Sequence, residues 1–507
     1  MLFLGFDSST QSLTAQLVEA AGTSARLVWE SSLNFERDLP MYGTRHGVVP
    51  SADPHVAEAP PAMWAQALEI MMARVAESGL DLSTLAAVSG SAQQHGTVYL
   101  GAEGFTRERS PIWLDATTGE ECAEITRAIG GDARVAALTG SRVFERFAGP
   151  QIRRFWKNHP AAYERTRRIH LISSFLCSEL LGHDAPIDSG DGSGMSLMNL
   201  STQQWDPRAL AATAPDLASK LPVISPPGRV AGTLAPRWRD RFGLPAADVV
   251  VWTGDNSSSL VGSGLVEEGT LGISLGTSDT IFGLMREPRV SADGEGHVFG
   301  APTGEFMGIT VFANGSLARE NIRDRYGLNW LGFRRALHAT PPGNRGGIMI
   351  PWFVPEITPH VSRPRVRRKD LDEHEAARNV RAIVEGQMMA MANHSQWMGV
   401  NVATIYATGG ASRNSDVLQV MADVFGARVF PSPVGNSACL GAAIRAWHAY
   451  EHARGGDLSW PDAVRDLATP DPNTAVMPNA AAVDVYRRLR VEYAAYERAP
   501  SSSSTTN

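Results

Sequence analysis

A hairpin pattern that opens the chain recurs near its middle. The segments Phe3-Leu-Gly-Phe-Asp-Ser-Ser-Thr10 and Ser274-Leu-Gly-Thr-Ser-Asp-Thr280 both place a glycine before a tip of Ser, Thr and Asp residues. Each segment continues into a second apolar run, so each predicts a β-hairpin with a polar turn. Internal duplication is the simplest explanation of this recurrence, and it predicts an α/β protein with two related halves. Two unrelated hairpins with glycine-rich turns are the alternative.

The length of the chain also favours two domains, because 507 residues are too many for one hydrophobic core. We expect an N-terminal domain over residues 1–247 and a C-terminal domain over 248–455. A helical segment with a disordered tail should follow over 456–507, with the tail at Ser501–Asn507. The proline-rich region Pro222–Pro245 is predicted to connect the two domains.

Composition excludes several classes of partner. A net charge of −7 argues against a general nucleic-acid or anionic-membrane binder, and no apolar run is long enough to span a bilayer. The three cysteines, Cys122, Cys177 and Cys439, are isolated, which excludes a paired-cysteine site and favours a reducing compartment. The N-terminus has neither the basic region nor the apolar core of a signal peptide. We therefore expect a soluble, cytoplasmic protein.

Asp255 is the first candidate functional residue. The β-branched run Val249–Trp252 predicts a buried strand that ends in the turn Thr253–Asn256, after which small and apolar residues predict a helix. Loops at the carboxyl ends of strands line the ligand crevice of open α/β sheets, so Asp255 is a candidate ligand-facing carboxylate. The alternative is that Asp255 caps the helix, which would stabilise it by about 1 kcal/mol.

Other polar side chains also follow predicted strands. Asp7 is expected at the tip of the first hairpin, where a structural role in an Asx-turn is the alternative to a functional one. Pro111–Asp115 is predicted to be a strand that ends in an acid. His95 lies in the glycine-flanked loop Ser89–Gly96 beside two amides, so it does not belong to an apolar helix face. A loop histidine is more often structural than functional, and that alternative stays open.

Three further segments carry candidate binding features. Arg142 or Arg146 could hold an anion or a polyol, although a salt bridge to Glu145 or to a neighbouring residue is the more ordinary role. Asp188–Gly194 predicts a polar, glycine-rich loop that lacks a dinucleotide fingerprint. The pair Gly409-Gly410 ends a predicted strand and lets the backbone approach a flat or phosphorylated ligand closely.

The order of these motifs resembles that of the FGGY carbohydrate kinases, members of the actin-like, ribonuclease-H-like superfamily. The segments GFDSSTQS, SAQQHG, PIWLD, TGSRVFERF, DSGDGSGM, TGDNSSSLVGSG, SLGTSDT, NGSLARENIR and ATGGASRN occur in family order between Leu2 and Trp447. Within the family the chain is most similar to the xylulokinase branch. Gln94-His95 replaces the Met-His of many bacterial members, which places the chain in another branch. The resemblance implies two actin-like domains around a central cleft, the first binding sugar and the second nucleotide.

The resemblance also implies a set of site residues. ATP and Mg²⁺ are the implied cofactors, with Asp7 as metal ligand and a nucleotide site formed by Asp7, Thr10, Gly276, Thr277, Trp330, Gly410 and Asn414. The implied sugar site consists of His95, Arg146, Asp255 and Asn256, with Asp255 as the general base. A sugar hydroxyl is a poor nucleophile, so a carboxylate that orients it and accepts its proton suits phosphoryl transfer.

The implied activity is ATP-dependent phosphorylation of D-xylulose, a ketopentose, at its 5-hydroxyl. One alternative is a kinase for another ketose or polyol, such as ribulose, xylitol or glycerol. Others are an actin-fold ATPase that needs no sugar and a catalytically silent sugar sensor. No nucleic-acid or membrane partner is expected. The sequence leaves the oligomeric state open, with a homodimer among the alternatives.

Overall fold

The structure, a computed structural model, describes residues 1–432 and 434–499, so the predicted tail Ser501–Asn507 lies outside the described residues. The chain divides into two compact units. The first unit comprises Met1–Glu267, Leu284–Met307 and Val434–Thr469, and the second comprises Glu268–Gly283, Gly308–Pro433 and Pro470–Asn507. Each unit thus draws on three separate segments of the chain, whereas consecutive ranges were predicted from the sequence.

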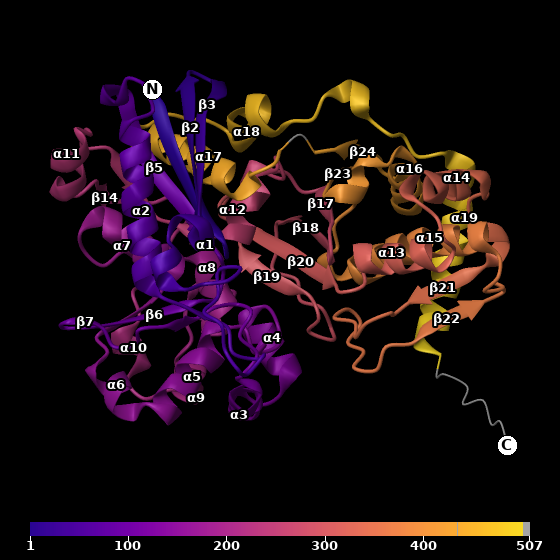
Figure 1. The fold of residues 1–507 in the computed structure, drawn as a ribbon, viewed down its shortest axis with the longest axis horizontal. Coiled ribbons are helices and arrows are strands. Elements are labelled where there is room, and N and C mark those ends of the chain that lie inside the picture. Colours follow the sequence, from indigo (N-terminus) through magenta and orange to yellow (C-terminus); the bar gives the residue numbers. More distant parts are fainter. Residues whose placement is uncertain (433, 500–507) are drawn as a thin grey trace. The chain divides into compact units, whose positions relative to one another are not determined.

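A mixed sheet forms the centre of the first unit. Strand β1 pairs antiparallel with β2 and parallel with β5, so the first hairpin lies in the middle of the sheet. The hairpin and the adjacent strand β3 are seen near the N-terminus in Figure 1. In sheet order the strands are β14 (Val230–Thr233), β15 (Asp248–Val250), β5 (Leu85–Ala92), β1 (Leu2–Ser8), β2 (Ser12–Ala21) and β3 (Ser24–Asn34), and β16 (Thr253–Gly254) also pairs with β5.

Helices cover both faces of this sheet because successive side chains of a strand point to opposite faces. Leu4 and Phe6 of β1 pack in the same cluster as Trp64 of α2, whereas Phe3 packs in the cluster that contains Trp447 of α17. The helices of these layers are α2 (Pro61–Ala76), α7 (Ile172–Leu181), α12 (Asp255–Gly262) and α17 (Ser437–Ala453).

The sheet of the second unit repeats the arrangement of the first. Strand β17 pairs antiparallel with β18 and parallel with β23, and β23 pairs parallel with β24. In sheet order the strands are β20 (Phe306–Phe312), β18 (Asp279–Met285), β17 (Thr270–Leu275), β23 (Thr404–Thr408) and β24 (Arg428–Pro431). Both predicted hairpins are therefore confirmed, and they occupy matching places in the two sheets, as duplication predicts.

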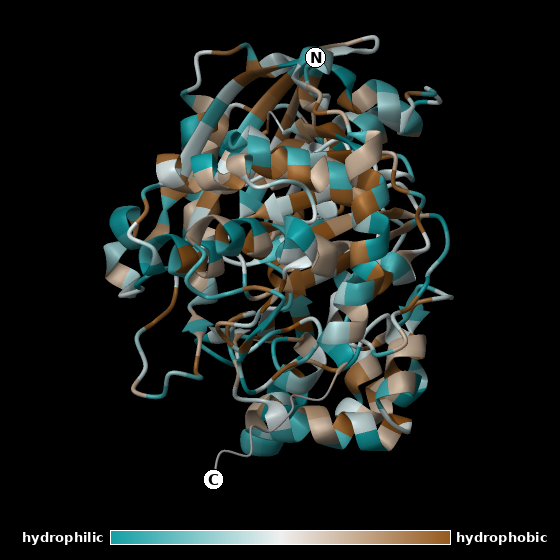
Figure 2. Ribbon diagram, turned by 90° about the vertical axis from the view of Figure 1, so that its right-hand side faces the viewer, coloured by the Kyte–Doolittle hydropathy of each residue, from teal (hydrophilic) through white to brown (hydrophobic). Residues whose placement is uncertain are grey.

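The core of the second unit is built around one helix that is buried over most of its surface. This helix, α15, contributes Ile383, Met388 and Met389 to the main apolar cluster. The flanking helices expose one face to solvent, and Figure 2 shows that helices of the protein alternate between hydrophobic and hydrophilic residues along their length. The helices are α13 (Ser316–Arg325), α14 (Trp330–Ala339), α15 (Ala376–His394), α16 (Ser415–Phe425) and α19 (Ala480–Arg498). In the described part of the chain, every helix is too short or too polar to cross a membrane.

Three local predictions were wrong. Only Ser110–Pro111 is a strand, and Asp115 follows it in a turn where its carboxylate accepts from the backbone of Ala57. Asp188–Gly194 is a buried turn of helix, α8 (Ser189–Gly192), with flanking residues, because its small side chains allow close packing. The region Pro222–Pro245 is an integral part of the first unit and contains β14 and the helix α11 (Pro236–Phe242).

Candidate active site

Asp255 is the first residue of α12, directly after the short strand β16. The N-cap position is held by Gly254, so the alternative that Asp255 serves as the helix cap is wrong. Helix α12 is fixed from behind by α17, because a Cβ on Gly262 would lie 1.8 Å from the carbonyl oxygen of Ser437. Only glycine permits this approach. The strand end and the packed helix together fix the backbone that carries Asp255.

Two carboxylates of the first unit lie close enough to influence each other. Asp7 of β1 is paired with Thr14 of β2, so it lies on the strand rather than at the hairpin tip. Its carboxylate accepts a hydrogen bond from Ser91 Oγ at 2.7 Å. Burial raises the pKa of Asp7 to about 6. Burial, followed by the negative charge of Asp7, raises the pKa of Asp255 to about 7. Both groups therefore favour a bound cation or an incoming proton near neutral pH.

His95 is held neutral in a strained loop. Its backbone φ is 78°, a left-handed conformation that is uncommon outside glycine. Burial, and then the charge of Arg146, lower the pKa of His95 to about 3. Nδ1 lies 2.8 Å from the carbonyl oxygen of Gly194, so Nδ1 carries the proton and donates. Nε2 is therefore a hydrogen-bond acceptor.

Arg146 is a cation without an anionic partner in the first unit. Its guanidinium donates to Nε2 of His297 at 3.0 Å and lies 4.9 Å from the ring centre of Phe144. The expected salt bridge to Glu145 is absent, since Glu145 is exposed and no carboxylate of the first unit lies within ion-pair distance. Burial lowers the pKa of Arg146 to about 10, which leaves it charged at neutral pH. Its positive charge is available to an oxygen-rich ligand.

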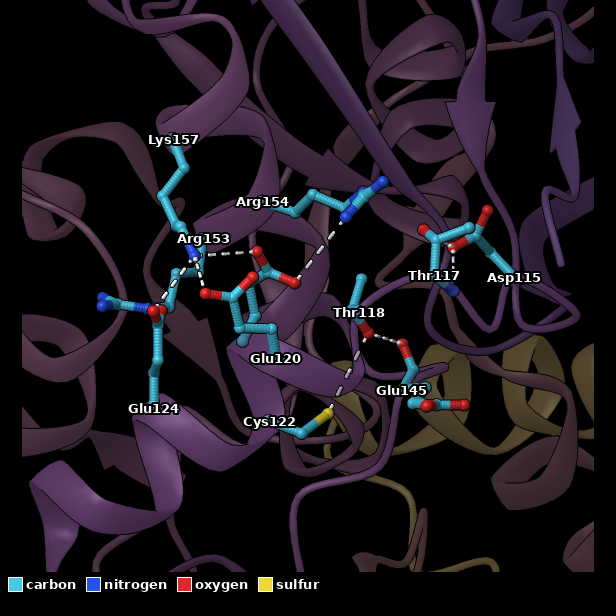
Figure 3. Close-up of polar contacts among 11 residues, drawn as sticks. Asp115, Thr117, Thr118, Glu120, Cys122, Glu124, Glu145, Arg153, Arg154 and Lys157 are labelled. Atoms are coloured by element: carbon cyan, nitrogen blue, oxygen red, sulfur yellow. Dashed lines mark hydrogen bonds and ion pairs between the residues drawn. The ribbon is translucent and has the colours of Figure 1, made fainter.

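Hydrogen bonds hold the backbone of the segment that carries Arg146. Thr118 Oγ1 donates to the carbonyl of Glu145 at 2.6 Å, and Gln151 Nε2 donates to the carbonyl of Arg146 at 3.1 Å. Thr118 precedes α3 (Gly119–Ile129), whose acidic residues bind Lys157 of α5 (Ala148–Asn158), as Figure 3 shows. This network fixes the backbone on which the guanidinium is mounted.

The predicted sugar residues are linked by hydrogen bonds and by ring contacts. Asn256 Nδ2 donates to Asp255 Oδ1 at 3.1 Å and to Gln94 Oε1 at 2.8 Å. The ring of His95 packs on Phe147, the residue that follows Arg146, with ring centres 4.5 Å apart. The first unit therefore brings two acids, an amide, a neutral imidazole and a guanidinium into one polar constellation.

Three residues of this constellation were not predicted. His297, on β19 (His297–Gly300), does not belong to any of the motifs found in the sequence. Asp191 was assigned to a polar, glycine-rich loop, but it is buried beside Ser173, and burial holds its pKa well above the usual range. Gln94 was noted as a neighbour of His95 and as a departure from the Met-His of many bacterial members, but it was given no role of its own. The two adjacent amides, Gln93 and Gln94, were a further signal, because consecutive amides in an apolar setting need hydrogen-bond partners.

The residues predicted to hold a nucleotide gather mainly in the second unit. A cavity of about 630 Å³ is lined by Gly276, Thr277, Trp330, Gly410 and Asn414, all five predicted from the second half of the chain. Trp330 is 48% exposed, and the guanidinium of Arg323 lies 4.5 Å from its ring centre. Thr10 belongs to the first unit, where its hydroxyl accepts from Trp113 Nε1 at 2.8 Å. The volume suits a small-molecule site.

One close backbone contact joins the turns that border this cavity. Gly409 has φ of 85°, and a Cβ there would lie 2.4 Å from the carbonyl oxygen of Leu275. The neighbouring Gly410 has open space where its Cβ would be. Asn414 caps α16 by accepting from the backbone of Asp416 at 3.0 Å. The β17 and β23 turns thus meet, and at Gly410 no side chain stands between the backbone and the ligand volume.

Comparison with known proteins gives consistent matches along the chain. Residues 2–262 match the N-terminal domain model of the FGGY family of carbohydrate kinases, and residues 271–450 match the C-terminal domain model. A xylulose kinase of Rattus norvegicus is 38% identical, with 98% of this chain and 96% of the relative covered. Xylulose kinase 2 of Arabidopsis thaliana is 36% identical over 89% of this chain and 87% of the relative.

Solved structures with low sequence identity share the fold. A xylulose kinase of Rhodospirillum rubrum superposes with a TM-score of 0.84 at 20% identity, with 98% of both chains covered. A glycerol kinase of Plasmodium falciparum with ADP gives a TM-score of 0.82 at 16% identity, again with 98% of both chains covered. Neighbours that differ in acceptor substrate therefore share one architecture, and the acceptor has to be inferred from the site.

Proposed function

The chain belongs to the FGGY family of carbohydrate kinases, and from this premise we propose that it transfers the terminal phosphate of ATP to the 5-hydroxyl of D-xylulose. The observation that carries the proposal is the polar constellation of the first unit. A base (Asp255), a neutral acceptor (His95) and an unpaired cation (Arg146) there match the needs of a polyol substrate. The relatives that share 36–38% identity are named as xylulose kinases.

Asp255 is proposed to be the general base. A catalytic base works best when its pKa lies near the working pH, and burial together with the charge of Asp7 raises the pKa of Asp255 to about 7. Its Oδ1 is fixed by the backbone N–H of Asn256 at 2.8 Å. The carboxylate would orient the 5-hydroxyl and accept its proton as the bond to phosphorus forms.

His95, Arg146 and Asn256 are proposed to bind the remaining oxygens of the sugar. Neutral His95 offers Nε2 as an acceptor, and Arg146 offers guanidinium N–H donors. Buried groups of this kind discriminate strongly between polar substrates, because a missing hydroxyl leaves one of them unsatisfied. The sugar specificity would thus arise in the first unit.

The residues around Asp7 fit a divalent cation. Asp7 has one side-chain hydrogen bond, from Ser91, and no cationic side chain of the first unit pairs with it. The described residues contain no cluster of three or more His, Cys, Asp or Glu side chains able to hold a metal. Mg²⁺ commonly takes only one or two protein carboxylates together with phosphate oxygens, so Asp7 suffices as the protein ligand. When bound, Mg²⁺ would neutralise charge on the phosphate oxygens.

The cavity of the second unit is proposed to hold ATP. Trp330 presents an aromatic face for the adenine, and the turns at Gly276-Thr277 and Gly410 present backbone N–H groups to anionic oxygens. The sugar bound by the first unit would accept the phosphate from the nucleotide bound by the second.

A panel of ketoses and polyols tests the proposed acceptor. Purified protein with ATP and Mg²⁺ should release ADP fastest with D-xylulose in a coupled assay, and the product should carry phosphate on its 5-oxygen. Faster turnover of ribulose, xylitol or glycerol would reassign the acceptor. Undiminished ADP release without any sugar would instead favour an actin-fold ATPase, the candidate that needs no sugar constellation.

A further inference from the structure

Gln94 belongs to the loop that carries His95, and its side chain contacts the helix that carries Asp255. Its side chain is 3% exposed. Nε2 donates to the carbonyl oxygen of Gly190 at 3.3 Å, and Oε1 accepts from Asn256 Nδ2 at 2.8 Å. A carbonyl oxygen can only accept, so the contact with Gly190 fixes which end of the Gln94 amide faces Asn256.

The orientation of Asn256 follows from that of Gln94. Asn256 Nδ2 donates to both Gln94 Oε1 and Asp255 Oδ1. A reversed Asn256 amide would direct its oxygen at these two acceptors, which is electrostatically unfavourable. No residue of the first unit donates a hydrogen bond to Asn256 Oδ1. This oxygen is left as a fixed acceptor, and its natural partner is a donor from a ligand.

Close packing of Gly254 restricts the position of the Gln94 side-chain amide. A Cβ on Gly254 would lie 2.4 Å from Cγ of Gln94 and 2.7 Å from its Nε2. Gly254 immediately precedes Asp255, so the amide packs directly on the strand end that carries the carboxylate. Asp191 also faces the amide and favours its donor end, which is the same orientation that Gly190 selects.

We propose that Gln94 is a positioning residue that sets the sugar specificity of this enzyme. By holding Asn256 with Oδ1 exposed to the substrate, it makes this position accept a hydrogen bond from one particular sugar hydroxyl. A sugar that places a hydroxyl there satisfies Asn256, whereas its epimer leaves the oxygen unpaired. This inference rests on the proposed function in taking Asn256 as a sugar-binding residue.

The variant Gln94→Met tests the proposal, because methionine has a similar length but no amide. We expect KM for the preferred sugar to rise about 10-fold or more, with KM for ATP changed less than about 2-fold. Discrimination between D-xylulose and its epimer D-ribulose should fall by a similar factor, because Asn256 can then reverse. An unchanged sugar KM and unchanged discrimination would overturn the proposal.

A double-mutant cycle separates this role from general damage to the site. Once Asn256→Ala has removed the controlled group, Gln94→Met should raise the sugar KM no further. Equal effects of Gln94→Met in both backgrounds would overturn the proposal. The control is Gln93→Met, because Gln93 is also buried but its side chain, in the described part of the protein, bonds only to the backbone carbonyl of Ser9. Its sugar KM should change less than about 2-fold, and an effect matching that of Gln94→Met would also count against Gln94.

Two arrangements keep the test decisive. If Gln94→Met does not fold, Gln94→Leu serves in the same cycle, because leucine also lacks an amide and adds no charge beside Asp191. The expected result is then a loss of discrimination in the wild-type background and no further loss once Asn256→Ala is present, and equal losses in both backgrounds would contradict the proposal. The cycle uses whichever sugar the wild-type protein phosphorylates fastest. A wrong assignment of D-xylulose is thus detected in the wild type, separately from the role of Gln94.

Discussion

The two hairpins share a backbone plan but use their carboxylates differently. In the first hairpin, Asp7 of β1 has, among the described residues, only the hydroxyl of Ser91 as a side-chain partner. In the second, Asp279 of β18 is 1% exposed, and both of its oxygens accept from Arg319, at 2.8 and 3.1 Å. Arg319 in turn donates to Gln387 of α15 at 2.8 Å.

The difference separates a reactive carboxylate from a structural one. The bidentate pair with Arg319 satisfies Asp279 internally, so this acid has little remaining affinity for a ligand. The charge of Asp7 is not compensated by a side chain, and ionising it in the folded protein costs free energy until a cation arrives. Asp255 shares this property with Asp7. We therefore expect the unpaired acids to govern activity and the paired acid to govern stability.

The largest expected effect is on turnover, from Asp255→Asn. The amide keeps the size of the side chain but cannot accept the hydroxyl proton, so kcat should fall by about 10³-fold, with sugar affinity within a few fold of wild type. Steady-state kinetics and calorimetric sugar titration measure the two quantities. Near-normal kcat would remove Asp255 from the mechanism.

Substitution of the paired acid should instead reduce stability. Asp279→Ala leaves Arg319 buried and uncompensated, so the free energy of unfolding should fall by about 3–5 kcal/mol, as measured by urea denaturation. The double variant Asp279→Ala/Arg319→Met is the matched control and should recover much of the loss. A stable Asp279→Ala protein with strongly reduced activity would contradict the division between the two hairpins.

His95→Ala should weaken sugar binding more than ATP binding. The loss of the Nε2 acceptor is expected to raise the sugar KM by about 10- to 100-fold and to leave the ATP KM within about 2-fold. Initial rates with each substrate varied in turn give both constants. A larger change in the ATP constant would place His95 outside the sugar site.

The smallest expected effect is on how the stability of the folded protein depends on pH. The pKa of Asp7 is raised to about 6 in the folded protein, above the ordinary value of about 3.9, so its contribution to stability is lost as pH rises from about 4 to 6. Without nucleotide or Mg²⁺, Asp7→Asn should therefore be more stable than wild type at pH 8 by about 1 kcal/mol, and similar to wild type at pH 4. Denaturation curves at both pH values measure this. A variant less stable at pH 8 would indicate that Asp7 is compensated in the fold.

The sequence by itself determined the elements whose signals are local. Alternating apolar residues and small polar turns identified both hairpins, and the β-branched run before Thr253 placed Asp255 at a strand end. The nearby loop glycines placed His95 outside regular structure. These predictions succeeded because backbone preferences and side-chain periodicity act over a few neighbouring residues.

The tertiary structure decided which distant groups meet and which acids lack partners. Arg146 and His297 are 151 positions apart, and Gln94 and Asn256 are 162 apart, so no spacing rule joins them. In the sequence, the buried turn at Asp188–Gly194 resembled a polar loop. The role of its glycines depends on the distant strands against which they pack. Burial and hydrogen-bond partners are set by the whole folded chain, and so are the pKa values and amide orientations on which the chemistry depends.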